Sequence, residues 1–536
     1  MYKTGNIYII AAISIIGGGL FGFDISSMSA LITTQAYLCY FNQQGHDKTG
    51  LCLGPRSSVQ GGITASMAGG SWLGALISGF LSDRLGRKTA IQIGAVIWVI
   101  GSIIVSASQG IGMLIVGRLI NGLCVGICSA QVPVYIAEIS PPTKRGRLIG
   151  AQQWAITWGI LIMYYISYGC AATLKGTEVF RVPWAVQMIP AIILFFGMFI
   201  LPESPRWLAS KDRWEDCEDV LVLTQGKGDR NHPMVRFEYN EIKEWIMLER
   251  EAKNVSYLEL IRPRMINRTH IGVFTQIWSQ LTGMNVMMYY ITYVFTMAGL
   301  KGNSNLIASS IQYIINVLMT VPALLYMDRW GRRPTLLVGA AFMATFMYIN
   351  GAIMATKGTY PGPQGVNGIV EASTQLSGAP AKAVIACTYL FVASFAPTWG
   401  PVSWTYPPEL YPNRVRGKAC ALSTSANWAF NFALGYFVPP AFVTIRWKLY
   451  IVFGIFCTAM FFHVFFLFPE TAGKPLEEVT EIFEDPKGIR YIGTPAWKTH
   501  NSYGQSHSME TRGEGLEKRF SHEESPERIE RGKEAV

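Results

Sequence analysis

Charged residues are scarce in this 536-residue chain and make up only 15% of it, whereas soluble domains average about 25%. Their distribution is also uneven, because residues 4–45 carry only Asp24 and residues 89–137 carry only Arg118. Uncharged stretches of this length exceed the roughly 20 residues that a helix needs to cross a membrane. The composition therefore excludes a wholly disordered chain and argues against a soluble fold.

Motifs of metal and nucleotide chemistry are absent as well. The 9 cysteines form no Cys-x-x-Cys pair and have no metal-ligand spacing with histidine, and no Gly-x-x-x-x-Gly-Lys-Ser/Thr loop occurs. We therefore expect no enzyme activity, no metal, no cofactor and no ATP-driven step. The net charge of +10 does not indicate a nucleic-acid partner either, because short loops hold most of the excess. Cys39 and Cys52 share one predicted loop, and the sequence leaves open whether they form a disulfide.

The uncharged stretches divide at polar residues, glycines and prolines into twelve segments of membrane-spanning length. The chain is therefore predicted to be an all-α polytopic membrane protein. We expect spans near 7–33, 61–81, 90–108, 111–135, 148–170, 183–201, 271–298, 306–327, 335–355, 384–407, 419–443 and 449–468.

Three polar signatures occur twice, in the same order, in the two halves of the chain. The segment GFLSDRLGRK at 79–88 is matched by DRWGRR at 328–333, and PESPR at 202–206 is matched by PET at 469–471. Between them, Glu138 with Arg145 recurs as Glu409 with Arg416 at the same spacing. Such a repeat indicates a duplication of a six-span unit.

The repeated loops are basic and all fall on one side of the predicted spans, which places that side in the cytoplasm by the positive-inside rule. Both termini then lie in the cytoplasm too, because the number of spans is even. The predicted organisation is a six-helix half at 1–201, a cytoplasmic central loop with short helices at 202–268, a second six-helix half at 269–468, and a cytoplasmic tail at 469–536 that is largely disordered at its end.

These signatures resemble those of the major facilitator superfamily and, more narrowly, of its sugar porter family. The loop at 79–88 is typical of the superfamily, and PESPRWL at 202–208, QLTGMN at 280–285 and PET at 469–471 are typical of sugar porters. The segment QIWSQLTGMNVMMYY at 276–290, together with TWGPVSW at 398–404, is similar to fungal high-affinity glucose transporters. The resemblance covers roughly residues 5–485 and implies the major facilitator fold, with twelve transmembrane helices in two pseudo-symmetric halves.

Asp24 and Arg118 are the two formal charges that lie well inside predicted spans. Charges inside a membrane are costly and often mark an ion pathway. The pair could be a static link between two helices, or a switch in which protonation of Asp24 releases Arg118. The matching residues in proton-coupled sugar porters are assigned this coupling role, which implies proton coupling here.

Sugars are uncharged and rich in hydroxyl groups, so a sugar site needs neutral donors and acceptors and flat apolar faces. The predicted spans supply such residues, and on one helix Gln276 and Gln280 share a face while Tyr289 lies one turn above Asn285. The alternative for any single amide is a hydrogen bond between helices. The resemblance implies substrate contact by Gln153, Gln276, Gln280, Asn285, Asn316, Trp404 and Asn427, with Phe21 and Tyr289 as aromatic liners. Ser279 stands where many sugar porters carry a second Gln.

Acidic and basic residues alternate in the predicted cytoplasmic loops of both halves. They could be solvated signals of membrane orientation, or they could form a latch between the halves that closes in the outward-facing state. We favour the latch and expect it to consist of Asp83, Arg84, Glu138, Arg145, Glu203, Arg206, Arg329, Arg333, Glu409 and Arg416. The tenth span, with Pro397, Pro401, Pro407 and Pro408, is expected to bend.

We interpret the chain as a carrier of a monosaccharide, glucose or a related hexose, that works by alternating access and preferably as a proton symporter. Facilitated uniport and a nontransporting glucose sensor are the alternatives, and a quinate, inositol or disaccharide porter is a more distant one. We expect a multi-pass protein of the plasma membrane. Its expected partners are the sugar and the lipid bilayer, with no obligate protein partner.

Overall fold

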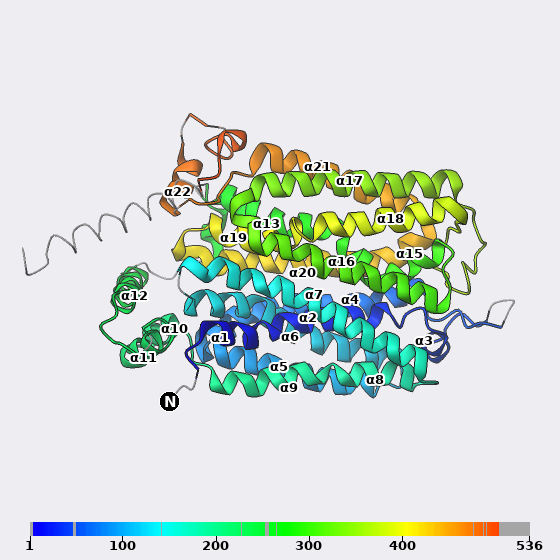
Figure 1. The fold of residues 1–536 in the computed structure, drawn as a ribbon, viewed down its shortest axis with the longest axis horizontal. Coiled ribbons are helices and arrows are strands. Elements are labelled where there is room, and N and C mark those ends of the chain that lie inside the picture. The colour runs from blue at the N-terminus through cyan, green and yellow to red at the C-terminus, as the bar shows by residue number, and fades with distance from the viewer. Residues whose placement is uncertain are drawn as a thin grey trace, which may run out of the picture.

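The computed structural model describes residues 4–46, 50–140, 142–226, 228–251, 257–263, 265–474, 476–485, 487–488 and 490–502. Within its helices the side chains of 142–147, 245, 248–251, 328, 413–414 and 476–477 are not described. These residues form helices joined by turns and isolated β-bridges, and the described ranges contain no β-strand. Long parallel and antiparallel helices make one bundle (Figure 1).

The first half of the bundle contains six membrane-spanning segments, because each long apolar stretch satisfies its backbone hydrogen bonds only by coiling into a helix. Two of them are interrupted by a local break. The segments are α1 (Ile7–Ser14) with α2 (Ile16–Ser29), α4 (Ser57–Leu85), α5 (Arg87–Ser106), α6 (Ile111–Ile139), α7 (Pro142–Thr173), and α8 (Glu178–Val186) with α9 (Met188–Ile200).

The second half repeats this arrangement and completes the twelve predicted spans. The two halves lie side by side, and the helices of both run along the long axis of the bundle (Figure 1). Its segments are α13 (Ile266–Leu281) with α14 (Met284–Tyr289) and α15 (Ile291–Met297), α16 (Gly302–Trp330), α17 (Arg332–Lys357), α18 (Gly378–Phe395) with α19 (Trp399–Leu410), α20 (Asn413–Thr444), and α21 (Lys448–Leu467).

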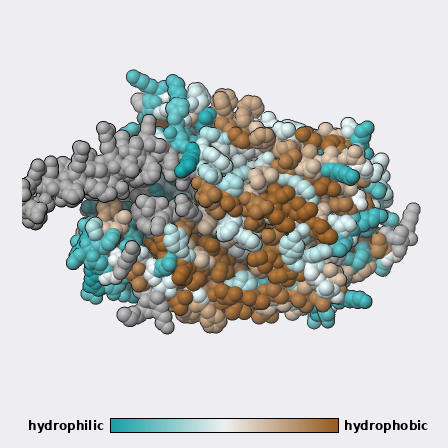
Figure 2. Space-filling model, in the orientation of Figure 1, coloured by the Kyte–Doolittle hydropathy of each residue, from teal (hydrophilic) through white to brown (hydrophobic). Residues whose placement is uncertain are grey.

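An apolar belt covers the middle of the face of the bundle drawn in Figure 2, between two polar ends. Large apolar side chains such as Phe80 and Phe196 are 69% and 64% exposed there, which suits contact with lipid. Nine of the described helical segments are long and apolar enough to span a membrane by composition alone. The α4, α13–α15 and α20 segments fall outside that set, because they are glycine-rich, polar or broken. Their place at the interface between the halves, where α4 packs on α20, accounts for this difference.

The two ends of the bundle differ in structure. One end, called here the basic end, carries α10 (Pro205–Ser210), α11 (Trp214–Thr224), α12 (Pro233–Glu251) and η1 (Tyr257–Ile261), and also the tail elements α22 (Leu476–Glu484) and η2 (Ala496–Lys498). The helices α10–α12 share a small apolar core of their own. The predicted disorder from about Thr499 concerns residues that, beyond 502, lie outside the described part of the chain.

The opposite end, called here the disulfide end, carries α3 (Gln35–Tyr40) and the loop 358–377. A disulfide joins Cys39 and Cys52. The pairing that the sequence left open is therefore made in the structure, and it holds α3 against the segment that leads into α4.

Two spans that approach the centre of the bundle are broken inside the apolar belt. The seventh span stops at Leu281 and resumes at Met284, and Gly283 between them has a φ of +84°, a conformation that favours glycine. The tenth span breaks between Phe395 and Trp399, around Pro397, as the proline cluster predicted. Such breaks free backbone groups where helices line a cavity rather than lipid.

Candidate functional site

A cavity lies between the two halves, about midway along the bundle. It is lined by residues of α2, α7, α13, α14, α16, α18, α19 and α20, and none of the lining side chains carries a formal charge. Most of the predicted sugar-contact residues meet there, namely Gln153, Gln280, Asn285, Asn316, Trp404, Asn427 and Phe21. Ser279 also lines it. The arrangement offers neutral hydrogen-bonding groups and the aromatic rings of Phe21, Phe395 and Trp404 in one place.

Four amide side chains on three helices form a continuous hydrogen-bonded chain along one wall. Asn285 Nδ2 donates to Gln280 Oε1 at 2.6 Å, and Gln280 Nε2 donates to Asn427 Oδ1 at 3.1 Å. Asn427 Nδ2 donates to Gln276 Oε1 at 2.7 Å, and Gln276 Nε2 donates to the Ser403 carbonyl at 2.8 Å. Because each amide orients the next, the wall presents its remaining donors and acceptors in fixed directions.

Two predicted contact residues, Gln276 and Tyr289, do not line the cavity. Gln276 is 2% exposed and stands behind Asn427 as the last amide of the chain. Tyr289 is also 2% exposed, and its hydroxyl has no hydrogen-bond partner in the described structure. Sugar contact by these two residues stays a prediction; Gln276 lies in α13 before the break at Gly283, and Tyr289 lies in α14 after it.

The sequence prediction missed part of the cavity wall. The additional lining residues are Ile25, Ile156, Ile160, Met284, Met288, Phe395, Gly400 and Ser403. Most are apolar side chains in apolar helices, where nothing in the sequence distinguishes a cavity face from a lipid face. A second hollow, between α5 and α9, is lined only by apolar residues and offers no group that could bind a sugar.

Asp24 and Arg118 form a buried ion pair between α2 and α6. Arg118 Nη2 lies 2.9 Å from Asp24 Oδ2, and each side chain is 1% exposed. Arg118 Nε also donates to the Ile63 carbonyl of α4 at 2.8 Å. Asp24 belongs to the same helix as the cavity residues Phe21 and Ile25, so a change in this pair can be transmitted directly to the cavity wall.

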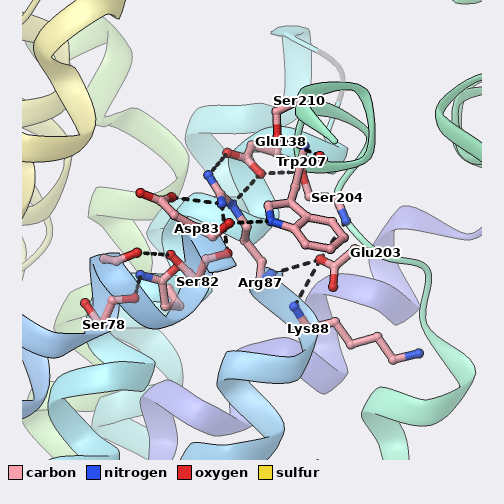
Figure 3. A network of polar contacts seen from close by, with 12 residues as sticks. Ser78, Ser82, Asp83, Arg87, Lys88, Glu138, Glu203, Ser204, Trp207 and Ser210 are labelled. Atoms are coloured by element: carbon pink, nitrogen blue, oxygen red, sulfur yellow. Dashed lines mark hydrogen bonds and ion pairs between the residues drawn. The ribbon is translucent and has the colours of Figure 1, made fainter. Parts of the chain in front are cut away.

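At the basic end of the first half, polar residues form the network drawn in Figure 3. The Arg87 guanidinium bonds both carboxylate oxygens of Glu138, at 3.1 and 3.2 Å, and contacts Asp83 at 3.3 Å. Glu203 Oε1 accepts the backbone N–H groups of Arg87, Lys88 and Ser204 at 3.0, 3.1 and 2.9 Å. Burial raises the pKa of Glu203, although these backbone donors favour its charged form.

The second half repeats the same network at its basic end. Arg332 bonds Glu409, with its closest contact at 2.7 Å. Glu470 accepts backbone N–H groups of Arg332 and Arg333 at 2.8 and 3.1 Å. Gly331, like its counterpart Gly86, has a positive φ, and a Cβ on it would meet the glutamate at 2.5 Å. The repeated sequence motifs therefore build the same cluster twice. In each half an arginine pairs with one glutamate, and a second glutamate accepts backbone N–H groups at the start of a helix. These clusters are called here the Arg87 clamp and the Arg332 clamp.

The residues predicted to form a latch between the halves make their described contacts within one half, and the latch itself stays a prediction. Arg87 pairs with Asp83 and Glu138, and Arg332 pairs with Glu409, so each of these ion pairs joins residues of the same half. Arg206 pairs instead with Glu241 of α12, Arg333 donates to the Phe465 carbonyl, and Arg416 donates to the Tyr411 carbonyl. Arg84 and Arg329 are exposed, and the Arg145 side chain lies outside the described residues. The central cations are Arg87 and Arg332, which the predicted set omitted.

We expect Arg332→Ala to lower the thermal stability of the protein. The substitution leaves the partly buried Glu409 carboxylate without its cation, and breaking such a pair costs about 3–5 kcal/mol when it is buried. A melting curve of the purified protein measures the effect. Arg329→Ala, one turn away and exposed, is the matched control and should melt like the wild type. Equal melting temperatures for all three proteins would contradict the clamp.

Known proteins are similar to this chain in sequence. Residues 10–483 match the sequence model of the family described as "Sugar (and other) transporter". The chain is 49% identical over 508 residues to the MFS glucose transporter mfs1 of Aspergillus flavus, covering 93% of this chain and 92% of that one. It is 48% identical over 499 residues to a high-affinity glucose transporter of Kluyveromyces lactis, covering 92% of this chain and 87% of the relative.

A solved structure shows the same fold. The MFS proton:xylose symporter XylE bound to 6-bromo-6-deoxy-D-glucose matches with a TM-score of 0.73 and 27% identity, covering 89% of this chain and 99% of the other. The twelve-span bundle, the duplicated clamps and the uncharged central cavity agree with these similarities. The chain therefore belongs to the sugar transporter family of the major facilitator superfamily.

Proposed function

We propose that this protein carries glucose or a related hexose across the plasma membrane by alternating access, as a proton symporter. The observation that carries the proposal is the central cavity, whose amides and aromatic rings suit an uncharged, hydroxyl-rich ring. Relatives named as glucose transporters and a fold shared with a proton:xylose symporter support it.

The contacts between the halves favour alternating access. Ser29 of α2 and Tyr313 of α16 share a hydrogen bond of 2.6 Å, and Tyr164 of α7 donates to the Leu306 carbonyl at 2.9 Å. Both contacts lie on the disulfide-end side of the cavity, so this state is closed toward that end. The Arg87 and Arg332 clamps hold each half together without tying the halves to one another, which suits two units that move as rigid bodies.

Orientation and location are part of the proposal. The basic end is placed in the cytoplasm, together with both termini, because its loops concentrate lysine and arginine. The disulfide between Cys39 and Cys52 supports an extracellular position for the other end, since disulfides persist in oxidising surroundings. No cofactor and no second protein is required in this scheme, in which the proton is the coupling ion.

Proton coupling is assigned to Asp24. Ionised, it is held by Arg118; protonated, it loses most of the attraction and frees α2 to move relative to α6. Because α2 also lines the sugar cavity, protonation and sugar binding favour the same rearrangement. A ligand shifts such an equilibrium only by its preference for one state, and Asp24 supplies that preference for the proton.

Uptake of labelled glucose tests the function. We expect cells without their own hexose carriers to gain saturable uptake when they express this chain, and we expect a protonophore to reduce it. Unlabelled glucose, xylose, galactose, fructose, quinate and inositol then serve as competitors that define the substrate. Absence of uptake despite normal surface expression would contradict transport and favour a sensor, while uptake that never exceeds equilibrium would favour a uniporter.

A further inference from the structure

Ser29, the last residue of α2, is held by the second half through both its side chain and its backbone. Its hydroxyl lies 2.6 Å from the hydroxyl of Tyr313 in α16, and its carbonyl accepts a hydrogen bond of 3.1 Å from the Thr292 hydroxyl of α15. All three residues are buried. Because α2 belongs to the first half, separation of the halves at the disulfide end breaks both bonds.

The Tyr313 hydroxyl makes a second bond, which leads to the sugar cavity. It donates to the Met288 carbonyl of α14 at 2.8 Å, and Met288 lines the cavity. A phenol has a single O–H, so the bond between the two hydroxyls takes its proton from the serine. The three groups therefore form one directed chain, in which Ser29 donates to Tyr313 and Tyr313 donates to Met288.

The Met288 carbonyl is available for this bond because the seventh span is broken. α14 has only six residues, and the last carbonyls of a helix find no partner within it. Two neighbouring residues of α16 bind them, since Gln312 donates to the Met287 carbonyl at 3.1 Å and Tyr313 to the next one. Asn285, the first amide of the cavity wall, belongs to the same short helix. A sugar that binds this amide therefore acts on the helix that Tyr313 holds.

A neighbouring bond between the halves lacks this link. Tyr164 of α7 donates to the Leu306 carbonyl of α16 at 2.9 Å, and neither residue lines the cavity. The rings of Tyr164 and Tyr313 pack together, with centroids 4.7 Å apart. A phenylalanine at position 313 would keep this packing and lose only the hydroxyl, so the link between gate and cavity depends on one oxygen atom.

We propose that Tyr313 is a positioning residue of the transport cycle, whose hydroxyl makes closure of the disulfide end depend on the placement of α14 at the sugar cavity. The inference rests on the proposed alternating access and assigns the coupling of cavity and gate to a residue that does not itself line the cavity. A sugar that fixes α14 directs the Met288 carbonyl at Tyr313, and Tyr313 then accepts the Ser29 hydroxyl of the other half.

Tyr313→Phe is expected to lower the maximal rate of glucose uptake without raising KM. In the closed state the variant leaves the Ser29 hydroxyl and the Met288 carbonyl without this partner, which shifts the closing equilibrium toward the open state by roughly 5- to 150-fold. The side chains that line the cavity are unchanged, so the sugar still binds. Initial uptake rates over a range of external glucose concentrations, normalised to surface expression, measure both constants.

Tyr389→Phe is the matched control for this variant. Tyr389 of α18 also donates its hydroxyl to a carbonyl of α16, that of Ala308 at 2.7 Å, but both residues belong to the second half. Its removal should leave KM and the maximal rate like those of the wild type. A raised KM with an unchanged maximal rate in Tyr313→Phe would make Tyr313 a sugar contact and overturn the inference.

Labelling from outside measures the gate without requiring transport. Every protein in this assay carries Ile160→Cys, which places a thiol of α7 at the cavity wall, and intact cells are treated with a membrane-impermeant maleimide. Mass spectrometry of the peptide that contains position 160 gives the labelling rate separately from the native cysteines. We expect Tyr313→Phe to raise this rate by at least about 5-fold and Tyr389→Phe to leave it unchanged.

The effect of glucose on this labelling tests the link to the cavity. Bound sugar shields position 160 directly in every variant, and in the wild type it also promotes closure. Saturating glucose should therefore slow labelling more in the wild type and in Tyr389→Phe than in Tyr313→Phe. Equal slowing in all three proteins would show that the hydroxyl does not couple the cavity to the gate.

Ser29→Ala keeps the inference testable if Tyr313→Phe does not fold, because it removes the other end of the same bond. It should also raise the labelling rate, and the double variant should label no faster than Tyr313→Phe alone. A wild-type rate in either single variant, or additive effects in the double variant, would overturn the inference. A chain that shows the expected labelling but takes up no glucose would contradict the transport proposal while supporting the role of Tyr313.

Discussion

Asp24→Asn is expected to abolish accumulation of glucose above equilibrium. In a fully coupled carrier a gradient of two pH units can drive accumulation of up to about 100-fold, since each unit is worth about 1.4 kcal/mol. Asn has the shape of Asp but stays neutral, so it imitates the protonated residue permanently. Arg118 then lacks the carboxylate that it contacts at 2.9 Å in the wild type. The proton gradient can therefore no longer change the contact between α2 and α6. We expect the accumulation ratio to fall to one.

Two transport modes separate lost coupling from a damaged protein. Exchange of labelled for unlabelled glucose needs no proton gradient and should persist in Asp24→Asn, whereas uphill uptake should not. Asp219→Asn, an exposed carboxyl of α11 that pairs with Arg230, is the matched control and should accumulate sugar like the wild type. Accumulation above equilibrium by Asp24→Asn would place the coupling group elsewhere.

Gln280→Ala is expected to raise the KM for glucose strongly. Gln280 is the central member of the amide wall, because it donates to Asn427 and accepts from Asn285. Its removal deletes a sugar contact and also releases both neighbours from their orientation. Losing such buried hydrogen bonds costs about 1–3 kcal/mol, which corresponds to an increase of roughly 5- to 150-fold in KM.

Initial uptake rates over a range of glucose concentrations, normalised to surface expression, measure this effect. Gln92→Ala is the control, because Gln92 lies in α5 on the side of α9 and outside the cavity. It should leave KM unchanged. A similar KM for Gln280→Ala and the wild type would mean that the amide wall does not bind the sugar.

The membrane fold was predictable because the cost of burying charge in lipid acts on each span separately. Asp24 and Arg118 stood out for the same reason, as two charges that only a partner could stabilise, and the structure pairs them at 2.9 Å. The cavity was predictable in part. Amides such as Gln153 and Asn316 are conspicuous in apolar helices, whereas Ile156 and Phe395 on the same wall are not.

Prediction and structure differ where the position of a side chain depends on the course of the backbone. Tyr289 was expected to line the cavity, but it follows the break at Gly283, is 2% exposed and does not line the cavity. Arg87 and Arg332 were absent from the predicted set, yet each holds a carboxylate of its own half. Short polar loops allow several pairings of similar energy, and helix packing selects one of them.

The sequence by itself determined the number of spans, their duplication and the two charges left inside the membrane, because hydrophobic length and the cost of burying charge are properties of each segment alone. The tertiary structure decided which amides share one wall and which carboxylates each arginine holds. These outcomes depend on contacts between residues that are far apart in the chain. No local pattern of sequence specifies them before the helices have packed.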